Sequence, residues 1–187
     1  MASEHYEEYK KKLLQLHDLE AQGKFESSEY DQVCDAMDAP GYKLSGLELK
    51  RIKDLAGDLN MLLGDEIKVK SEKSIDPREF ERVANSEQWD DLLDMLRLEN
   101  FPATEDQIAS TRSACWSALG DYDVALLFAE YASKLKPENP NYRIAVTINR
   151  LNLGLPVAPA AMAEMSSVMS HHVLNNSIHE MSFLKSA

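Results

Sequence analysis

Apolar residues recur every three or four positions along most of the chain, and glycine and proline interrupt this pattern at helix-length intervals. In the first stretch the apolar stripe consists of Tyr6, Tyr9, Leu13 and Leu16. This spacing predicts an amphipathic helix that ends at Gly23. His5 and His17 fall on the polar side or edge of that helix, so we expect both to be surface residues.

Capping residues mark the starts of later helices. Ser45 and Glu48 have the spacing of a capping box, and Thr104 and Gln107 repeat it. Asp76 is an N-cap residue followed by proline at the first helical position. These signals and the apolar periodicity predict helices over residues 28–41, 45–64, 76–85, 89–98, 104–120, 122–136 and 140–154. No segment alternates with a period of two for long enough to predict a strand, so the expected fold class is all-α.

A repeat signal is concentrated in residues 116–139. The turn Gly120-Asp121-Tyr122-Asp123 is followed by alanines at positions 125 and 132, and the segment closes with Lys-Pro-Glu-Asn. This run resembles the second half of a tetratricopeptide repeat (TPR), and on that frame the repeat spans 106–139. Ser113 stands where the family prefers glycine, and Ala129 where it prefers a bulky aromatic residue. Phe128, one position earlier, compensates for Ala129 in this reading.

The same period extends the resemblance in both directions. Trp89 lies 33 residues before Tyr122, so residues 76–102 resemble a degenerate repeat. Gly154 lies 34 residues after Gly120, so the stretch from residue 140 resembles the first helix of another repeat. The resemblance implies antiparallel helical pairs stacked as a short TPR-like solenoid.

The expected organisation has four parts. Residues 1–64 form an N-terminal helical segment, and they resemble only segments of uncharacterised bacterial proteins, which imply no activity. Residues 65–75 are polar and mixed in charge, which favours a linker and fits a single exposed strand equally well. Residues 76–155 hold the TPR-like helical repeats, and residues 156–187 form a C-terminal capping helix or tail.

The resemblance also implies a function, because stacked helical pairs present a concave groove that holds a peptide or a partner helix. The groove-lining positions of the repeat frame are Gln107, Ser110, Ala114, Ser117, Asn141, Ile144 and Ile148. We therefore expect a non-catalytic protein–protein interaction module whose partner is a protein or peptide. Two alternatives stay open: an escort chaperone of the secretion type, and a groove filled by the protein's own N-terminal helices or C-terminal segment.

Charge and cysteine content bear on which other classes of function and which compartment we expect. The 187-residue chain has a net charge of −12, which disfavours binding to nucleic acid and to anionic membranes. The two cysteines, Cys34 and Cys115, belong to no metal-binding pattern and favour a reducing compartment, although a disulfide between them stays open. With no signal-peptide pattern at the start, we expect a cytoplasmic protein, which also has the option of forming a homo-oligomer.

The C-terminal segment gathers soft donor side chains, and copper is the metal that suits thioether and imidazole ligands. The candidate ligands are Met162, Met165, Met169 and His172. The three methionines also share one helical face, which is typical of a packing stripe or of an adaptable surface for a partner helix. No phosphate-binding, dinucleotide-binding, nucleophile-elbow or zinc-protease motif occurs in the sequence, so we expect no enzyme and no cofactor.

Overall fold

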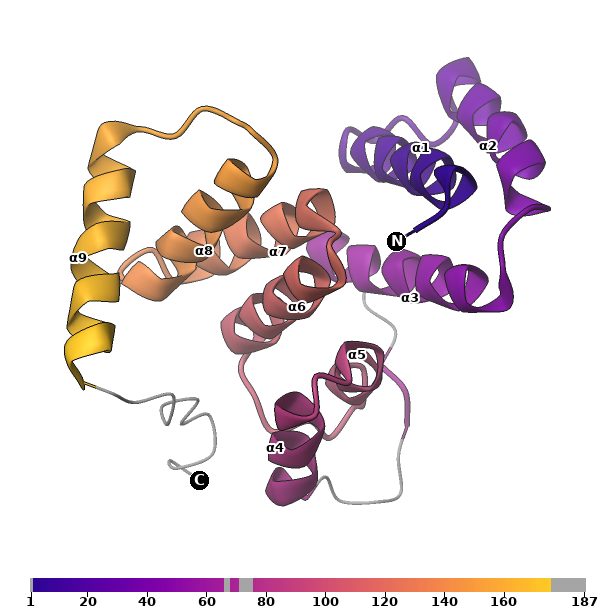
Figure 1. The fold of residues 1–187 in the computed structure, drawn as a ribbon. Coiled ribbons are helices and arrows are strands. Elements are labelled where there is room, and N and C mark those ends of the chain that lie inside the picture. The colour runs from indigo at the N-terminus through magenta and orange to yellow at the C-terminus, as the bar shows by residue number, and fades with distance from the viewer. Residues whose placement is uncertain (1, 66–67, 71–75, 176–187) are drawn as a thin grey trace. The chain divides into compact units, whose positions relative to one another are not determined.

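A computed structural model describes residues 2–65, 68–70 and 76–175. Within these ranges the backbone forms nine α-helices and no strand, so the all-α prediction is confirmed (Figure 1). The helices are α1 (Glu4–Ala21), α2 (Ser28–Gly41), α3 (Gly46–Leu63), α4 (Pro77–Asn85), α5 (Trp89–Leu96), α6 (Glu105–Leu119), α7 (Tyr122–Leu135), α8 (Pro140–Asn152) and α9 (Pro159–Asn175). The chain divides into two compact units, Met1–Lys68 and Val69–Ala187.

The predicted caps are present at the helix starts. The Ser45 hydroxyl accepts from the backbone N–H of Glu48, and the Glu48 carboxylate accepts from the backbone N–H of Ser45. A second capping box joins Thr104 to Gln107 at the start of α6. The Asp76 carboxylate accepts from the backbone N–H of Arg78 at 2.9 Å. Each contact satisfies backbone donors that a helix start leaves without a partner.

The N-terminal unit packs α1 against α2 and α3. Its apolar cluster is formed by Leu16, Leu19, Val33 and Met37, with Tyr9, Leu13, Tyr30 and Cys34 packed around it. His17 is only 8% exposed, so the expectation that it lies on the surface is wrong. Its position next to Leu16 on α1 turns it toward the neighbouring helices, whereas the sequence pattern placed it at the edge of the stripe.

In the C-terminal unit each helix packs against the next, and α6 also contacts α8 (Figure 1). The core includes three leucines of α5 and one aromatic residue from each of α6 and α7. Its members include Leu92, Leu93, Leu96, Trp116, Val124 and Phe128, all nearly inaccessible to solvent. This packing order brings α6 and α8 next to each other, so that the Tyr142 hydroxyl donates to Asp106, 36 residues away, at 2.8 Å.

The turn between α6 and α7 explains their close packing. Gly120 ends α6 with a φ of +91°, a left-handed conformation that costs glycine little. Farther along the two helices, the Ser113 hydroxyl donates to the backbone carbonyl of Ala125 at 2.8 Å. Ala125, Ala129 and Ala132 are all buried. Small side chains therefore let these helices approach closely enough for a side chain of one to reach the backbone of the other.

The segment after α3 makes one backbone pairing of its own. Val69 forms an isolated parallel bridge with Leu98. The Val69 N–H donates to the carbonyl of Arg97 at 2.8 Å, and the N–H of Glu99 donates to the carbonyl of Val69 at 2.9 Å. The boundary between the two compact units falls between residues 68 and 69, inside the stretch 65–75.

Candidate partner-binding face

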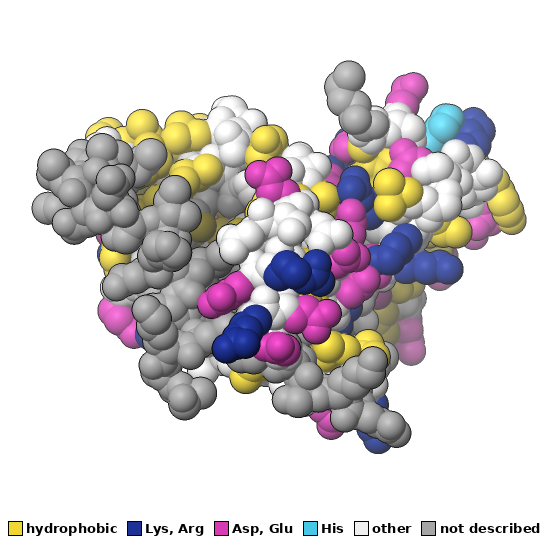
Figure 2. All heavy atoms as spheres, turned by 60° about the horizontal axis from the view of Figure 1, so that its bottom comes forward, with side chains coloured by type: hydrophobic (Ala, Val, Ile, Leu, Met, Phe, Trp, Pro, Cys, Tyr) yellow, Lys and Arg dark blue, Asp and Glu magenta, His cyan; other side chains and the backbone are white. Residues whose placement is uncertain are grey.

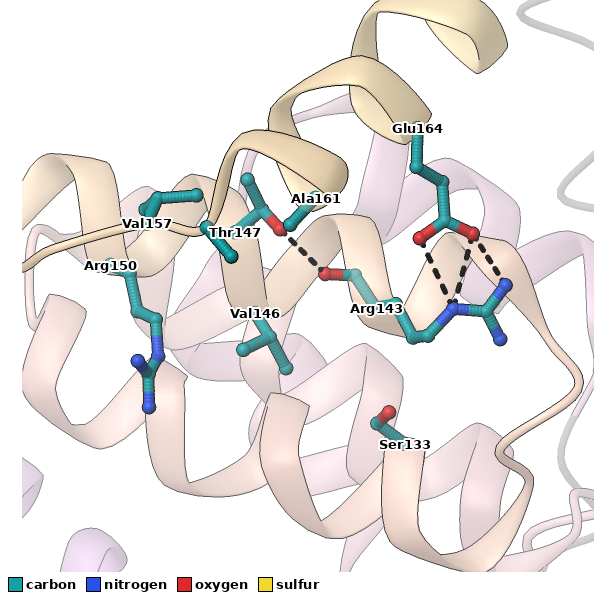
Figure 3. A pocket seen from close by; sticks show the side chains of 9 residues that line it. Ser133, Arg143, Val146, Thr147, Arg150, Val157, Ala161 and Glu164 are labelled. Carbon is teal, nitrogen blue, oxygen red and sulfur yellow. Dashed lines mark hydrogen bonds and ion pairs between the residues drawn. The ribbon is translucent and has the colours of Figure 1, made fainter.

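Helix α8 has two distinct outward faces. Because successive residues are about 100° apart around a helix, Asn141 and Ile148 share one face, and Arg143, Val146 and Arg150 share another. The second face, together with α7 and α9, lines a pocket (Figure 3). The first face is absent from that pocket lining, so α9 leaves Asn141 and Ile148 uncovered.

The residues predicted to line a groove differ in their accessibility. Ala114 and Asn141 are exposed and Ile148 is 38% exposed, so these three offer a surface to a partner. Gln107, Ser110 and Ser117 are half-buried. They occupy one side of α6, whose opposite side carries the buried Ile108, Arg112, Cys115 and Trp116.

Two of the predicted groove residues have structural tasks. The Gln107 side chain accepts from the backbone N–H of Thr104 at 3.0 Å and so caps α6. Ile144 is buried and belongs to the core. The contact between α6 and α8 nevertheless brings the two stripes of predicted residues onto neighbouring helices. We call the surface formed by the exposed Ala114, Asn141, Ile148 and Leu151 and the half-buried Ser117 the α6/α8 face.

Exposed apolar residues continue from the end of α8 into the following loop. Their members are Ile148, Leu151, Leu153 and Leu155, each between 37% and 42% exposed. Large apolar side chains clustered on a surface are typical of interaction sites. Of these four, only Ile148 was predicted to line the groove, because the groove-lining positions of the repeat frame end at residue 148.

Sequence reasoning missed the pocket between α7, α8 and α9, which encloses about 250 Å³. Arg143 and Glu164 point toward each other across it (Figure 3). The Arg143 Nε donates to both carboxylate oxygens of Glu164, at 3.1 and 3.2 Å, and the Arg143 Nη1 donates to the carbonyl of Pro137. The two residues are 21 positions apart in the sequence, and no local spacing pattern predicts that they pair.

The charges of this pocket are matched in pairs. Hydrogen bonding with Glu164 raises the pKa of Arg143, and the same contact lowers the pKa of Glu164. The Arg150 Nη2 donates to Glu130 at 3.1 Å, whereas the Arg150 Nε is buried with no hydrogen-bond partner among the described residues. The ion pairs connect α8 to its two neighbours, so the arrangement holds α9 against α8.

The proposed soft-metal ligands are described only in part. On α9, Met162 is exposed and Met165 is half-buried. The side chains of Met169 and His172 lie outside the described residues. In the described part of the chain, no group of three or more His, Cys, Asp or Glu side chains is arranged to hold a metal ion.

Surface charge follows no single-sign pattern on the face drawn in Figure 2, where acidic and basic side chains lie interspersed. Local ion pairs account for part of this mixing, as with Arg97 and Asp94 at 2.8 Å. Among the helices of the described ranges, none combines the length and the apolar character that crossing a bilayer requires. Cys34 and Cys115 do not form a disulfide.

Comparisons of the chain with protein-family models, with curated proteins and with solved structures gave no match.

Proposed function

We propose that the C-terminal unit is a non-catalytic interaction module that holds a peptide or a partner helix along the α6/α8 face. The observation that carries this proposal is the contact between α6 and α8, which puts the exposed Ala114 on one helix beside the helix that exposes Asn141 and Ile148. Ala114 and Ser117 leave room for a partner backbone, and Ile148 and Leu151 supply apolar contact area.

The proposal includes a TPR-like arrangement of the helical pairs. Three contacts support it: α6 against α7, α7 against α8, and α6 against α8. In stacked helical pairs, the first helix of one pair lies beside the first helix of the next, which is the relation between α6 and α8. The left-handed Gly120 and the hydrogen bond from Ser113 to Ala125 supply the tight turn and close crossing that such pairs need.

The chemistry of the α6/α8 face favours an amphipathic partner. Its five side chains are small, amide-bearing or aliphatic, and none of them carries a charge. A helix or extended peptide with apolar anchors would bury Ile148 and Leu151, and its polar groups would reach the Asn141 amide. Cys34 and Cys115 form no disulfide with each other, which fits a reducing compartment, so the proposal is for a cytoplasmic protein.

A capture experiment from native lysate tests the proposed face. The variant carries Ala114→Arg and Ile148→Asp, which place charge and bulk on the face at exposed positions. The control is Leu135→Asp, which makes the same apolar-to-acidic change at an exposed position of α7. Circular dichroism establishes that all three proteins are folded.

The proposal predicts a protein that wild type and Leu135→Asp retain and the double variant loses. Retention of the same proteins by all three forms would contradict it, since binding would then lie elsewhere. Loss from both variants would also contradict it, because a charged substitution outside the face would then abolish binding as well.

A further inference from the structure

A cavity of about 230 Å³ lies in the N-terminal unit, where α1, α2 and α3 meet. Its apolar wall is made by Leu13, Leu16, Ala56 and Leu59. Its polar wall is made by His17, Glu20, Tyr30 and Asn60. The cavity is separate from the α6/α8 face, so an inference drawn from it does not depend on the proposed function.

Helical spacing explains why these side chains converge. On α1, Leu13 and Leu16 precede His17 and Glu20 at intervals of three and four, which puts the apolar and polar residues on adjoining strips of one surface. Tyr30 reaches the cavity from the first turn of α2. On α3, Leu59 and Asn60 approach from the other side, one apolar and one polar.

His17 is a buried polar group of the cavity with an unpaired nitrogen. The side chain is 8% exposed, and its Nδ1 atom is buried with no hydrogen-bond partner among the described residues. Burial lowers the pKa of His17, and this effect outweighs the neighbouring carboxylates of Asp18 and Glu20, which raise it. The ring is therefore neutral at neutral pH and has one nitrogen available to accept a hydrogen bond.

Glu20 brings a negative charge to the same wall. The Tyr30 hydroxyl donates to the Glu20 Oε1 at 2.8 Å, and this hydrogen bond is the main reason why the pKa of Tyr30 rises to about 12. The second carboxylate oxygen of Glu20 has no hydrogen-bond partner within the described residues, and the same holds for the Asn60 side-chain amide. Three acceptors thus border the cavity with hydrogen-bonding capacity left over.

We propose that this cavity binds a small organic cation, a primary amine that carries one apolar group of about the size of a benzene ring. An ammonium group supplies three N–H donors, which match the acceptors of His17, Glu20 and Asn60. The leucines enclose the apolar part. A dry cavity of roughly 150 Å³ is large enough for benzene, so this larger cavity holds the ring and a short alkylamine chain.

Charge selects among the possible ligand classes. Residues 1–68 contain nine basic and fifteen acidic side chains, so the unit as a whole attracts cations. A carboxylate ligand would face the Glu20 carboxylate at close range. A wholly apolar ligand would leave the buried His17 nitrogen unsatisfied. A primary amine with an apolar group can donate hydrogen bonds to the polar wall and pack against the apolar wall.

The test is a titration of the ¹⁵N-labelled full chain, followed by NMR, with three probes of similar shape. 2-Phenylethylamine carries the cation, 2-phenylethanol is its neutral counterpart and 3-phenylpropionate carries the opposite charge. The proposal predicts saturable shifts for the amine that are confined to amides of α1, α2 and α3. Hydrogen bonds to charged groups make the amine bind about 10- to 100-fold more tightly than the alcohol, and the carboxylate does not bind.

Two variants distinguish the effect of the Glu20 carboxylate on amine affinity from the effect of the unit's overall negative charge. Glu20→Gln keeps the shape of the side chain and removes its charge, so amine affinity falls about 10- to 100-fold. Glu26→Gln removes a charge at an exposed position outside the cavity, and amine affinity stays at the wild-type value. Equal affinity of wild type for amine and alcohol would overturn the proposal. So would the absence of saturation, or an unchanged affinity in Glu20→Gln.

Discussion

Replacing Ala125 with leucine probes the crossing of α6 and α7. Ala125 has no solvent-exposed surface, and its carbonyl accepts the hydrogen bond from Ser113 at 2.8 Å. Leucine adds three carbon atoms at this crossing. If the site had room for them, burial would stabilise the protein by about 0.8 kcal/mol per carbon. Because the helices already touch, the added atoms push them apart, and overpacking of this kind costs about 1–3 kcal/mol.

Urea denaturation followed by tryptophan fluorescence measures this cost. Both tryptophans of the chain, Trp89 and Trp116, lie in the C-terminal unit, so the signal reports on that unit alone. We expect a lower midpoint with an unchanged dependence on urea concentration. The matched control is Ala118→Leu, which adds the same atoms at an exposed position of α6 and changes stability by less than about 0.5 kcal/mol. An Ala125→Leu protein as stable as this control, or more stable than wild type, would refute the close crossing.

Three further predictions concern single contacts. Gly120→Ala destabilises the C-terminal unit by about 1–2 kcal/mol in the same urea assay, because a φ of +91° strains any residue with a Cβ. A Gly120→Ala protein as stable as wild type would contradict the left-handed turn. Arg143→Ala removes the ion pair with Glu164, so hydrogen exchange accelerates at amides 162–168 of α9 and stays unchanged at the amides of α6. Unchanged exchange in α9 would mean that the ion pair does not hold this helix in place. Hydrogen bonds from Ser3 and Ser45 lower the pKa of Glu48 to about 2, so its stabilising effect is present above pH 4.5 and is lost as the pH falls toward 2. NMR titration of the carboxyl group measures this value, and Ser45→Ala moves it toward 4.5; a wild-type value near 4.5 would show that the capping contacts do not form in solution.

Local signals in the sequence predicted the helices well. The capping boxes at Ser45 and Thr104 and the N-cap at Asp76 all lie where the spacing predicted them, because each depends on residues within one turn. The periodicity also predicted a helix over residues 89–98, and α5 runs from Trp89 to Leu96. Such features are encoded locally, so neighbouring residues suffice to locate them.

Features that depend on residues far apart in the sequence could not be predicted from local signals. His17 appeared to lie at the polar edge of α1, and its burial follows from how α1 packs with the rest of its unit. The Arg143–Glu164 pair depends on how α9 returns along α8 after the loop at residues 153–158. Ile144 fits the repeat frame as a groove residue, yet it is buried. In each case the feature is decided by a tertiary contact, which no local pattern in a single sequence predicts.

The most direct measurement for the central claim places a photo-crosslinking amino acid at single positions of the full chain in native lysate. One protein carries it at Ala114 on the α6/α8 face, and the other carries it at Lys134, an exposed position of α7 outside that face. The account predicts a discrete crosslinked partner from position 114 and none from position 134. Crosslinking from position 134 alone, or the same products from both positions, would contradict a binding site on the α6/α8 face.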